Sequence, residues 1–130
     1  MVHVSHGHRR YNEPVVNIKR IYKQPAKDDG YRILVDRLWP RGMSKEKAAF
    51  DEWLKDVAPS NELRNWFGHK PERFNKFRER YITELRDNPA FERLKGIVES
   101  NKVVTLLYAA HDEKHNEAVL LQELLGKPGA

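Results

Sequence analysis

Two short, almost uninterrupted apolar runs constrain what this chain can fold into more than any other feature of its sequence. They are Tyr31–Asp36 (YRILVD) and Val103–Tyr108 (VVTLLY), and both contain several β-branched residues. Runs of this length without a polar face are typical of strands that are buried on both sides, as in parallel sheets. We therefore predict that the two runs are interior strands that lie parallel, either as neighbours or one strand apart.

The segments around these runs alternate between strand and helix patterns. Val15–Tyr22 predicts another strand, and Ser60 and Gly68 suit the N-cap and the C-terminal end of a helix between them. Later segments carry apolar residues at steps of three and four, as in amphipathic helices. The clearest stripe consists of Phe74, Phe77, Tyr81 and Leu85. This order predicts an α/β fold in three layers, a small, partly parallel sheet flanked by helices, which is Rossmann-like in general plan without a dinucleotide fingerprint.

The length of 130 residues suits a single domain. We expect an α/β domain over residues 15–126, between an N-terminal tail (1–14) and a C-terminal tail (127–130). The chain has no cysteine, which excludes disulfides, thiolate metal ligands and a cysteine nucleophile. We find no apolar targeting segment, and the longest apolar stretch is too short to span a bilayer. We therefore expect a cytoplasmic protein with no membrane partner.

Positive charge is concentrated in the first part of the chain. Residues 1–47 carry 11 basic and 5 acidic side chains, a net charge of +6, whereas the remainder carries 13 and 14. A basic half is typical of proteins with an anionic partner such as a phosphate, a nucleotide or a nucleic acid. A solvated basic surface without a partner would have the same composition.

The loop after the first apolar run, Asp36–Gly42 (DRLWPRG), is the best candidate for a binding site. Ligands of open parallel sheets bind outside the carboxyl ends of the strands, where this loop begins. Arg37 and Arg41 carry forked donors that suit phosphate or carboxylate, and Trp39 offers a flat apolar wall. In the structural alternative, Asp36 and Arg37 form a buried ion pair and Trp39 belongs to the core.

Further candidate residues lie on later segments. Lys55 and Arg64 would add positive charge to a ligand site, and His69 either acts as a general acid or base or caps a helix. If the interior strands are parallel, Asp112 and Asn116 come close to the DRLWPRG loop. Asn116 would then contact the ligand, and Asp112 would move protons or be the N-cap of the last helix.

No pattern in the sequence predicts a metal or a cofactor. His111 and His115 stand four residues apart, but the glutamate of a helical zinc motif is absent. The histidines at positions 3, 6 and 8 are interpreted as part of a polar tail. The glycines are isolated, so neither a dinucleotide loop nor a P-loop is present.

Several long motifs make the chain resemble a known family. They are YRILVDRLWPRG (31–42), WLK (53–55), APS (58–60), LRNWFGH (63–69) and VTLLYA (104–109), together with Asn116. On these motifs the sequence resembles the YeaO-like family (DUF488), a bacterial domain family of unknown function, over roughly residues 15–125. Lys70 and His111 stand where that family often has aspartate and lysine. The resemblance implies a shared fold and no established activity.

The function that these residues favour is the binding, and possible transformation, of a small anionic metabolite that is phosphorylated or nucleotide-like. Arg37 and Arg41 would hold the anion beside Trp39, and His69 or Asp112 would move protons in any reaction. The alternative is a nucleic-acid-binding or regulatory module, although we expect no sequence-specific nucleic-acid binding. A further alternative is a structural or partner-binding domain in which the aromatic stripe of residues 74–85 forms a homodimer face.

Overall fold

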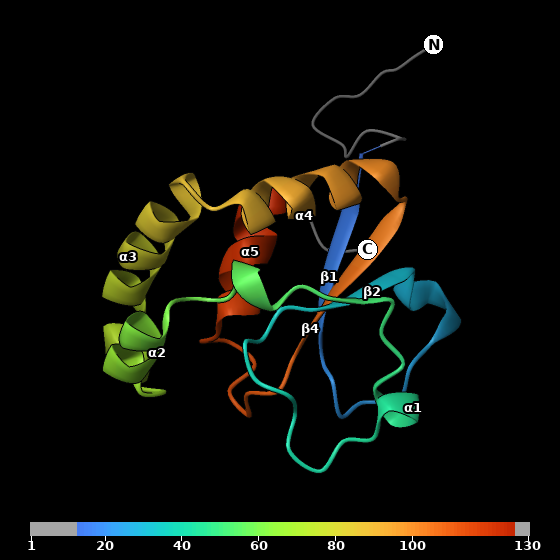
Figure 1. The fold of residues 1–130 in the computed structure, drawn as a ribbon, viewed down its shortest axis with the longest axis horizontal. Coiled ribbons are helices and arrows are strands. Elements are labelled where there is room, and N and C mark those ends of the chain that lie inside the picture. The colour runs from blue at the N-terminus through green and yellow to red at the C-terminus, as the bar shows by residue number, and fades with distance from the viewer. Residues whose placement is uncertain (1–12, 127–130) are drawn as a thin grey trace.

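The computed structural model describes residues 13–126, which form a four-stranded sheet covered by helices (Figure 1). The strands are β1 (Val15–Arg20), β2 (Tyr31–Leu34), β3 (Glu52–Trp53) and β4 (Val103–Tyr108). They run parallel in the order β1-β4-β2-β3, so the sheet is parallel throughout rather than in part. The predicted α/β class is confirmed, and so is the prediction that the two apolar runs are parallel interior neighbours.

Helices make up most of the remaining described chain. The α-helices are α1 (Lys45–Ala48), α2 (Asn61–Phe67), α3 (Phe74–Arg86), α4 (Pro89–Ser100) and α5 (Glu117–Leu125). The 3₁₀ helices are η1 (Lys27–Asp29), η2 (Lys55–Val57) and η3 (Pro71–Arg73). The predicted ends of α2 are confirmed, because the Ser60 hydroxyl accepts a hydrogen bond from the Leu63 N–H at 3.1 Å and Gly68 is left-handed.

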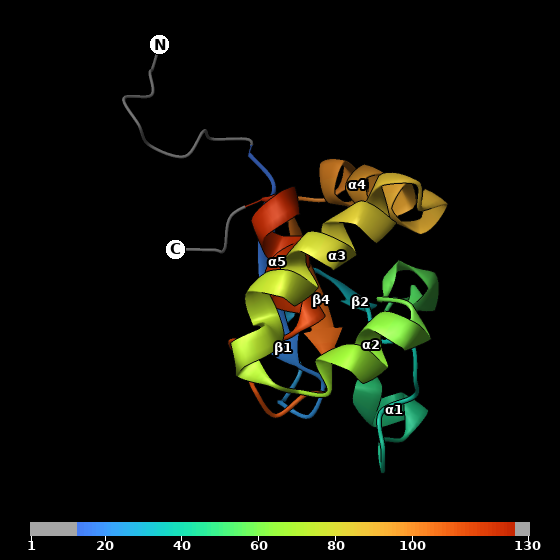
Figure 2. The same ribbon diagram turned by 90° about the vertical axis from the view of Figure 1, so that its left-hand side faces the viewer.

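The helices are distributed unequally over the two faces of the sheet. On one face, side chains such as Ile33, Val104 and Leu106 pack in a large core with residues of α2, α3, α4 and α5. Figure 2 shows α3 and α5 in front of the strands. On the other face, Leu34 and Leu107 form a small cluster with α1 and the loop between β2 and β3. The third layer is thin because α1 ends after four residues, where Ala49 adopts a left-handed conformation with a φ of 47°.

Two strands end earlier than the sequence pattern predicts. β1 ends at Arg20 instead of Tyr22, and β2 ends at Leu34 instead of Asp36. Both strands pair with β4, whose last residue lies opposite Arg20. One more backbone bond to β4 follows each strand, because the Ile21 N–H donates to the Tyr108 carbonyl at 2.7 Å and the Val35 N–H to the Leu107 carbonyl at 3.1 Å. After these bonds the chain leaves the sheet and forms loops.

The aromatic stripe of α3 belongs to the core. Its four side chains, at positions 74, 77, 81 and 85, are between 0% and 7% exposed. They are therefore buried within this chain, and the stripe does not supply the homodimer face considered above. No helix within residues 13–126 is long and apolar enough to cross a membrane.

Candidate functional site

The carboxyl ends of the parallel strands bring distant parts of the chain to one edge of the sheet. Tyr22 follows β1, the loop of residues 36–43 follows β2, Lys55 follows β3 and Asp112 follows β4. We call residues 36–43 the Arg/Trp loop. Figure 1 shows the connections after β1, β2 and β4 gathered at the lower end of the sheet. This edge is where parallel sheets bind ligands.

Arg37 attaches the Arg/Trp loop to the segment that precedes α2. Its Nε donates to the Pro59 carbonyl at 3.3 Å and its Nη2 to the Ala58 carbonyl at 3.1 Å. Its Nη1 lies 3.9 Å from a carboxylate oxygen of Asp56, and the side chain is 28% exposed. No hydrogen bond or ion pair joins Arg37 to Asp36, so the expected alternative of a buried pair between these neighbours is wrong. Asp36 instead accepts a hydrogen bond from the Ala109 N–H at 2.9 Å.

The Trp39 side chain contacts two neighbouring aromatic rings and is partly exposed to solvent. Its indole N–H donates to the Met43 carbonyl at 2.8 Å, and its ring meets Phe50 and Trp53 edge-on, with centroids 5.8 and 5.5 Å apart. These contacts fix the plane of the indole. The side chain is 38% exposed and belongs to neither hydrophobic cluster of the described chain, so the expected alternative of a core role for Trp39 is wrong.

Arg41 and Lys55 carry free positive charge at the same edge. The Arg41 carbonyl accepts a hydrogen bond from the Tyr22 hydroxyl at 2.8 Å, which ties the turn after β1 to the Arg/Trp loop. The Arg41 guanidinium is bound to no other residue of the described chain. The Lys55 ammonium lies 5.5 Å from the centre of the Trp53 ring, which also contacts Trp39.

Two predicted site residues lie elsewhere. Arg64 is exposed on α2, where it donates to the Asn61 side chain at 3.2 Å. His69 follows Gly68 in a left-handed conformation, with a φ of 57°, and its ring lies 6.5 Å from that of Phe67. No hydrogen bond, ion pair or ring contact joins either side chain to the Arg/Trp loop.

Asp112 and Asn116 shape the turn between β4 and α5. The N-cap of α5 is Asn116, not Asp112, because the Asn116 side chain accepts from the Val119 N–H at 3.1 Å. The Asn116 amide also donates to the Asp112 carbonyl at 2.8 Å, and the residue is 3% exposed. Both ends of the amide are therefore engaged, so Asn116 positions the turn that carries Asp112.

Asp112 forms an acid–base pair with His115. One carboxylate oxygen accepts from the backbone N–H groups of Lys114 and His115, and the other lies 2.9 Å from the His115 Nδ1. The Lys114 N–H, followed by the His115 side chain, lowers the pKa of the Asp112 carboxyl. The sequence indicated no role for His115, because its spacing from His111 lacks the glutamate of a zinc motif. Residues 13–126 contain no group of three side chains that could hold a metal ion, and the N-terminal histidines lie outside the described residues.

A buried carboxyl group beneath this edge was not predicted. Glu117 opens α5, and its Oε2 is buried without a hydrogen-bond partner among the described residues. Burial, followed by the charge of Asp36 and a hydrogen bond to it, raises the pKa of Glu117 well above its usual value. Burial and then the charge of Glu117 likewise raise the pKa of Tyr81, whose hydroxyl donates to the Val57 carbonyl at 2.6 Å. Glu117 therefore keeps its proton to a higher pH than an ordinary glutamate.

The contacts of Arg37 lead to a stability prediction. Arg37→Ala removes the donors of two carbonyls, so we expect it to lower the free energy of unfolding by about 1–3 kcal/mol. Arg41→Ala removes no such contact and should change the free energy by less than about 0.5 kcal/mol. Urea denaturation of both variants measures the difference. Equal free energies for the two variants would contradict the anchoring role of Arg37.

Comparisons with known proteins identify the family. The chain is 42% identical over 115 residues to an uncharacterized protein of Mycobacterium tuberculosis (strain H37Rv), which covers 88% of this chain and 98% of that relative. It is 40% identical over 110 residues to the uncharacterized protein YeaO of Escherichia coli (strain K12), covering 85% and 96%. No solved structure matches. The model of a family described as the inactive DUF488-N3 subclade matches residues 15–128, so the resemblance to YeaO-like proteins is confirmed and the chain belongs to this DUF488 subclade.

Proposed function

We propose that this protein binds a small phosphorylated ligand with a planar ring, such as a nucleotide, at the carboxyl edge of its sheet. The observation that carries the proposal is the surface around the Arg/Trp loop. Four large hydrophobic side chains are exposed in the described chain, and three of them, Tyr22, Leu38 and Trp39, belong to this edge. Exposed aromatic side chains that are held in a fixed orientation favour the stacking of a planar ring.

The charges at this edge support an anionic group on the ligand. The Arg41 guanidinium and the Lys55 ammonium have no carboxylate partner within residues 13–126. The Arg41 backbone is bonded to the exposed Tyr22, and the Lys55 ammonium lies beside the half-buried Trp53 ring. Arg37 is held by two carbonyls, so little of its side-chain entropy is lost when a ligand binds its remaining donor. Guanidinium forks and phosphate oxygens form strong, charge-assisted hydrogen bonds.

We propose binding without a chemical step. The matching family is described as inactive, and its relatives named above are uncharacterized proteins. The two residues that we predicted to move protons, His69 and Asp112, are not joined to the Arg/Trp loop by any hydrogen bond or ring contact. Their catalytic roles therefore remain predictions from the sequence.

Arg41→Ala should weaken the binding of a nucleoside phosphate by about tenfold or more, because a charge-assisted contact contributes about 1.5–3 kcal/mol. Binding can be followed by isothermal titration with a panel of nucleoside mono-, di- and triphosphates. The unphosphorylated nucleosides test the contribution of the phosphate, and Trp39→Ala tests that of the ring.

Lys102→Ala is a matched control for this experiment. Lys102 is an exposed cation that directly precedes β4, so it lies at the opposite edge of the sheet. We expect this variant to bind like the parent. An equal loss of affinity in both variants would show general charge attraction and contradict a site at Arg41. Tighter binding of single-stranded oligonucleotides than of any mononucleotide would favour the nucleic-acid alternative.

A further inference from the structure

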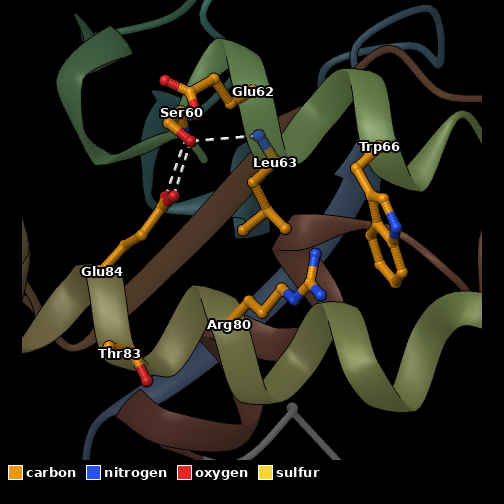
Figure 3. Close-up of a pocket in the computed structure, with 7 residues that line it drawn as sticks. All are labelled: Ser60, Glu62, Leu63, Trp66, Arg80, Thr83 and Glu84. Carbon is orange, nitrogen blue, oxygen red and sulfur yellow. Dashed lines mark hydrogen bonds between the residues drawn. The ribbon is translucent and has the colours of Figure 1, made fainter.

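A groove between α2 and α3 lies apart from the residues of the Arg/Trp loop. It has a volume of about 460 Å³, which is within the usual range of ligand sites. It is lined by Ser60, Glu62, Leu63, Trp66, Arg80, Thr83 and Glu84 (Figure 3). None of the ligand residues of the proposed function lines this groove.

Three polar side chains of the groove are already engaged within the protein. The two carboxylate oxygens of Glu84 accept from the backbone N–H and the hydroxyl of Ser60, at 2.9 and 2.6 Å. The Thr83 hydroxyl donates to the Glu79 carbonyl at 3.1 Å. Figure 3 shows the Ser60–Glu84 pair at one end of the groove and Arg80 with Trp66 at the other. The first end therefore offers a ligand no free donor from these groups.

The other end carries uncompensated positive charge. The Arg80 guanidinium carbon lies 4.3 Å from the centre of the Trp66 ring, and that of Arg73 lies 5.1 Å from the same ring. Arg73 also donates to the Trp66 carbonyl. Neither arginine forms an ion pair with another described residue. Two cations thus lie close to one indole, Arg80 in the lining of the groove and Arg73 outside it, an arrangement that a bound anion would stabilise.

From these contacts we propose that the groove is a second binding site, for a small monocarboxylate with an aromatic or apolar body. The fork of Arg80 matches a carboxylate, which can accept two parallel hydrogen bonds. Leu63, which is buried, and Trp66, which is half-buried, supply the apolar wall for the body of the ligand. The carboxylates of Glu62 and Glu84 place negative charge at the Ser60 end, which favours a monoanion over a doubly charged phosphate.

Titration with 1-naphthoate, followed by the indole N–H signal of Trp66 in NMR spectra, tests this proposal. We expect saturable binding with a dissociation constant of about 1 mM or below. Trp66→Phe assigns the signal, and 1-naphthamide serves as the neutral ligand of matched shape. The amide should bind at least tenfold more weakly than the carboxylate.

Two arginines of α3 provide matched variants. Arg80→Gln should weaken naphthoate binding at least tenfold, whereas Arg86→Gln, at an exposed position outside the groove, should leave it unchanged. Arg41→Ala should also leave it unchanged, which separates this site from the proposed nucleotide site. Unaltered binding by Arg80→Gln, equal binding of the amide, or no saturable shift of the Trp66 signal would each overturn the proposal.

Discussion

Replacing Asp29 by alanine is expected to lower the free energy of unfolding by about 3–5 kcal/mol, because it leaves a buried guanidinium without its carboxylate. The Asp29 carboxylate lies 2.6 Å from the Arg32 Nη1 and 2.9 Å from the Lys19 ammonium. Arg32 is 5% exposed, and its other donors reach the Ala48 and Ala49 carbonyls at 2.8 and 2.7 Å. Arg32 lies on the face of the sheet that carries the smaller hydrophobic cluster, and its guanidinium bonds join β2 to α1 and to Asp29.

The effect of Asp29→Ala should depend on pH. Desolvation raises the pKa of the Asp29 carboxyl, but hydrogen bonds from the Ala26 N–H, Lys19 and Arg32 outweigh it and hold the pKa below its ordinary value of 3.8. The stabilisation is therefore present above that ordinary value and is lost as the pH falls through the pKa of the folded state. Urea denaturation at neutral and acidic pH measures both effects.

Asp28→Ala is the control for Asp29→Ala. Asp28 is the exposed neighbour in η1, and its loss should change the free energy by less than about 0.5 kcal/mol. The double variant Asp29→Ala, Arg32→Met removes both charges and should recover part of the lost stability. A cost of less than about 1 kcal/mol for Asp29→Ala would contradict the role of this pair.

Glu117→Gln is expected to change how stability varies with pH. The folded protein binds the proton of Glu117 more tightly than the unfolded chain, because the pKa is raised by burial, by the charge of Asp36 and by a hydrogen bond to it. The free energy of unfolding should therefore fall as the pH rises from about the ordinary value of 4.5 to the pKa of the folded state. One proton contributes a slope of at most about 1.4 kcal/mol per pH unit.

Glutamine cannot ionise, so the variant should lack this contribution and become more stable than the parent as the pH rises through the same interval. Chemical denaturation at a series of pH values from acidic to mildly alkaline measures the two curves. Glu99→Gln, at an exposed position on α4, should reproduce the parent curve. Parallel curves for the parent and Glu117→Gln would show that the Glu117 carboxyl is not buried as described.

The sequence determined those parts of the fold that depend on local pattern and composition. Almost uninterrupted apolar character marked β2 and β4 as interior strands, because a strand covered on both faces holds few polar side chains. Arg32 and Thr105 are the buried polar side chains of these two strands. The spacing of Phe74 to Leu85 marked a buried helix face, and Ser60 and Gly68 marked the ends of α2. The position of the Arg/Trp loop at the carboxyl edge followed from the parallel strands.

The tertiary structure alone decided which side chains meet at that edge. Arg37 donates to carbonyls about 20 positions away instead of pairing with its neighbour Asp36. Asp36 in turn raises the pKa of Glu117, which is far from it in the sequence. Asn116, rather than Asp112, caps α5 because the turn after β4 is longer than the pattern indicated. Such contacts join residues far apart in sequence and leave no periodic signal. They depend on the conformations that the loops adopt at the edge of the sheet, and local sequence patterns do not specify these conformations.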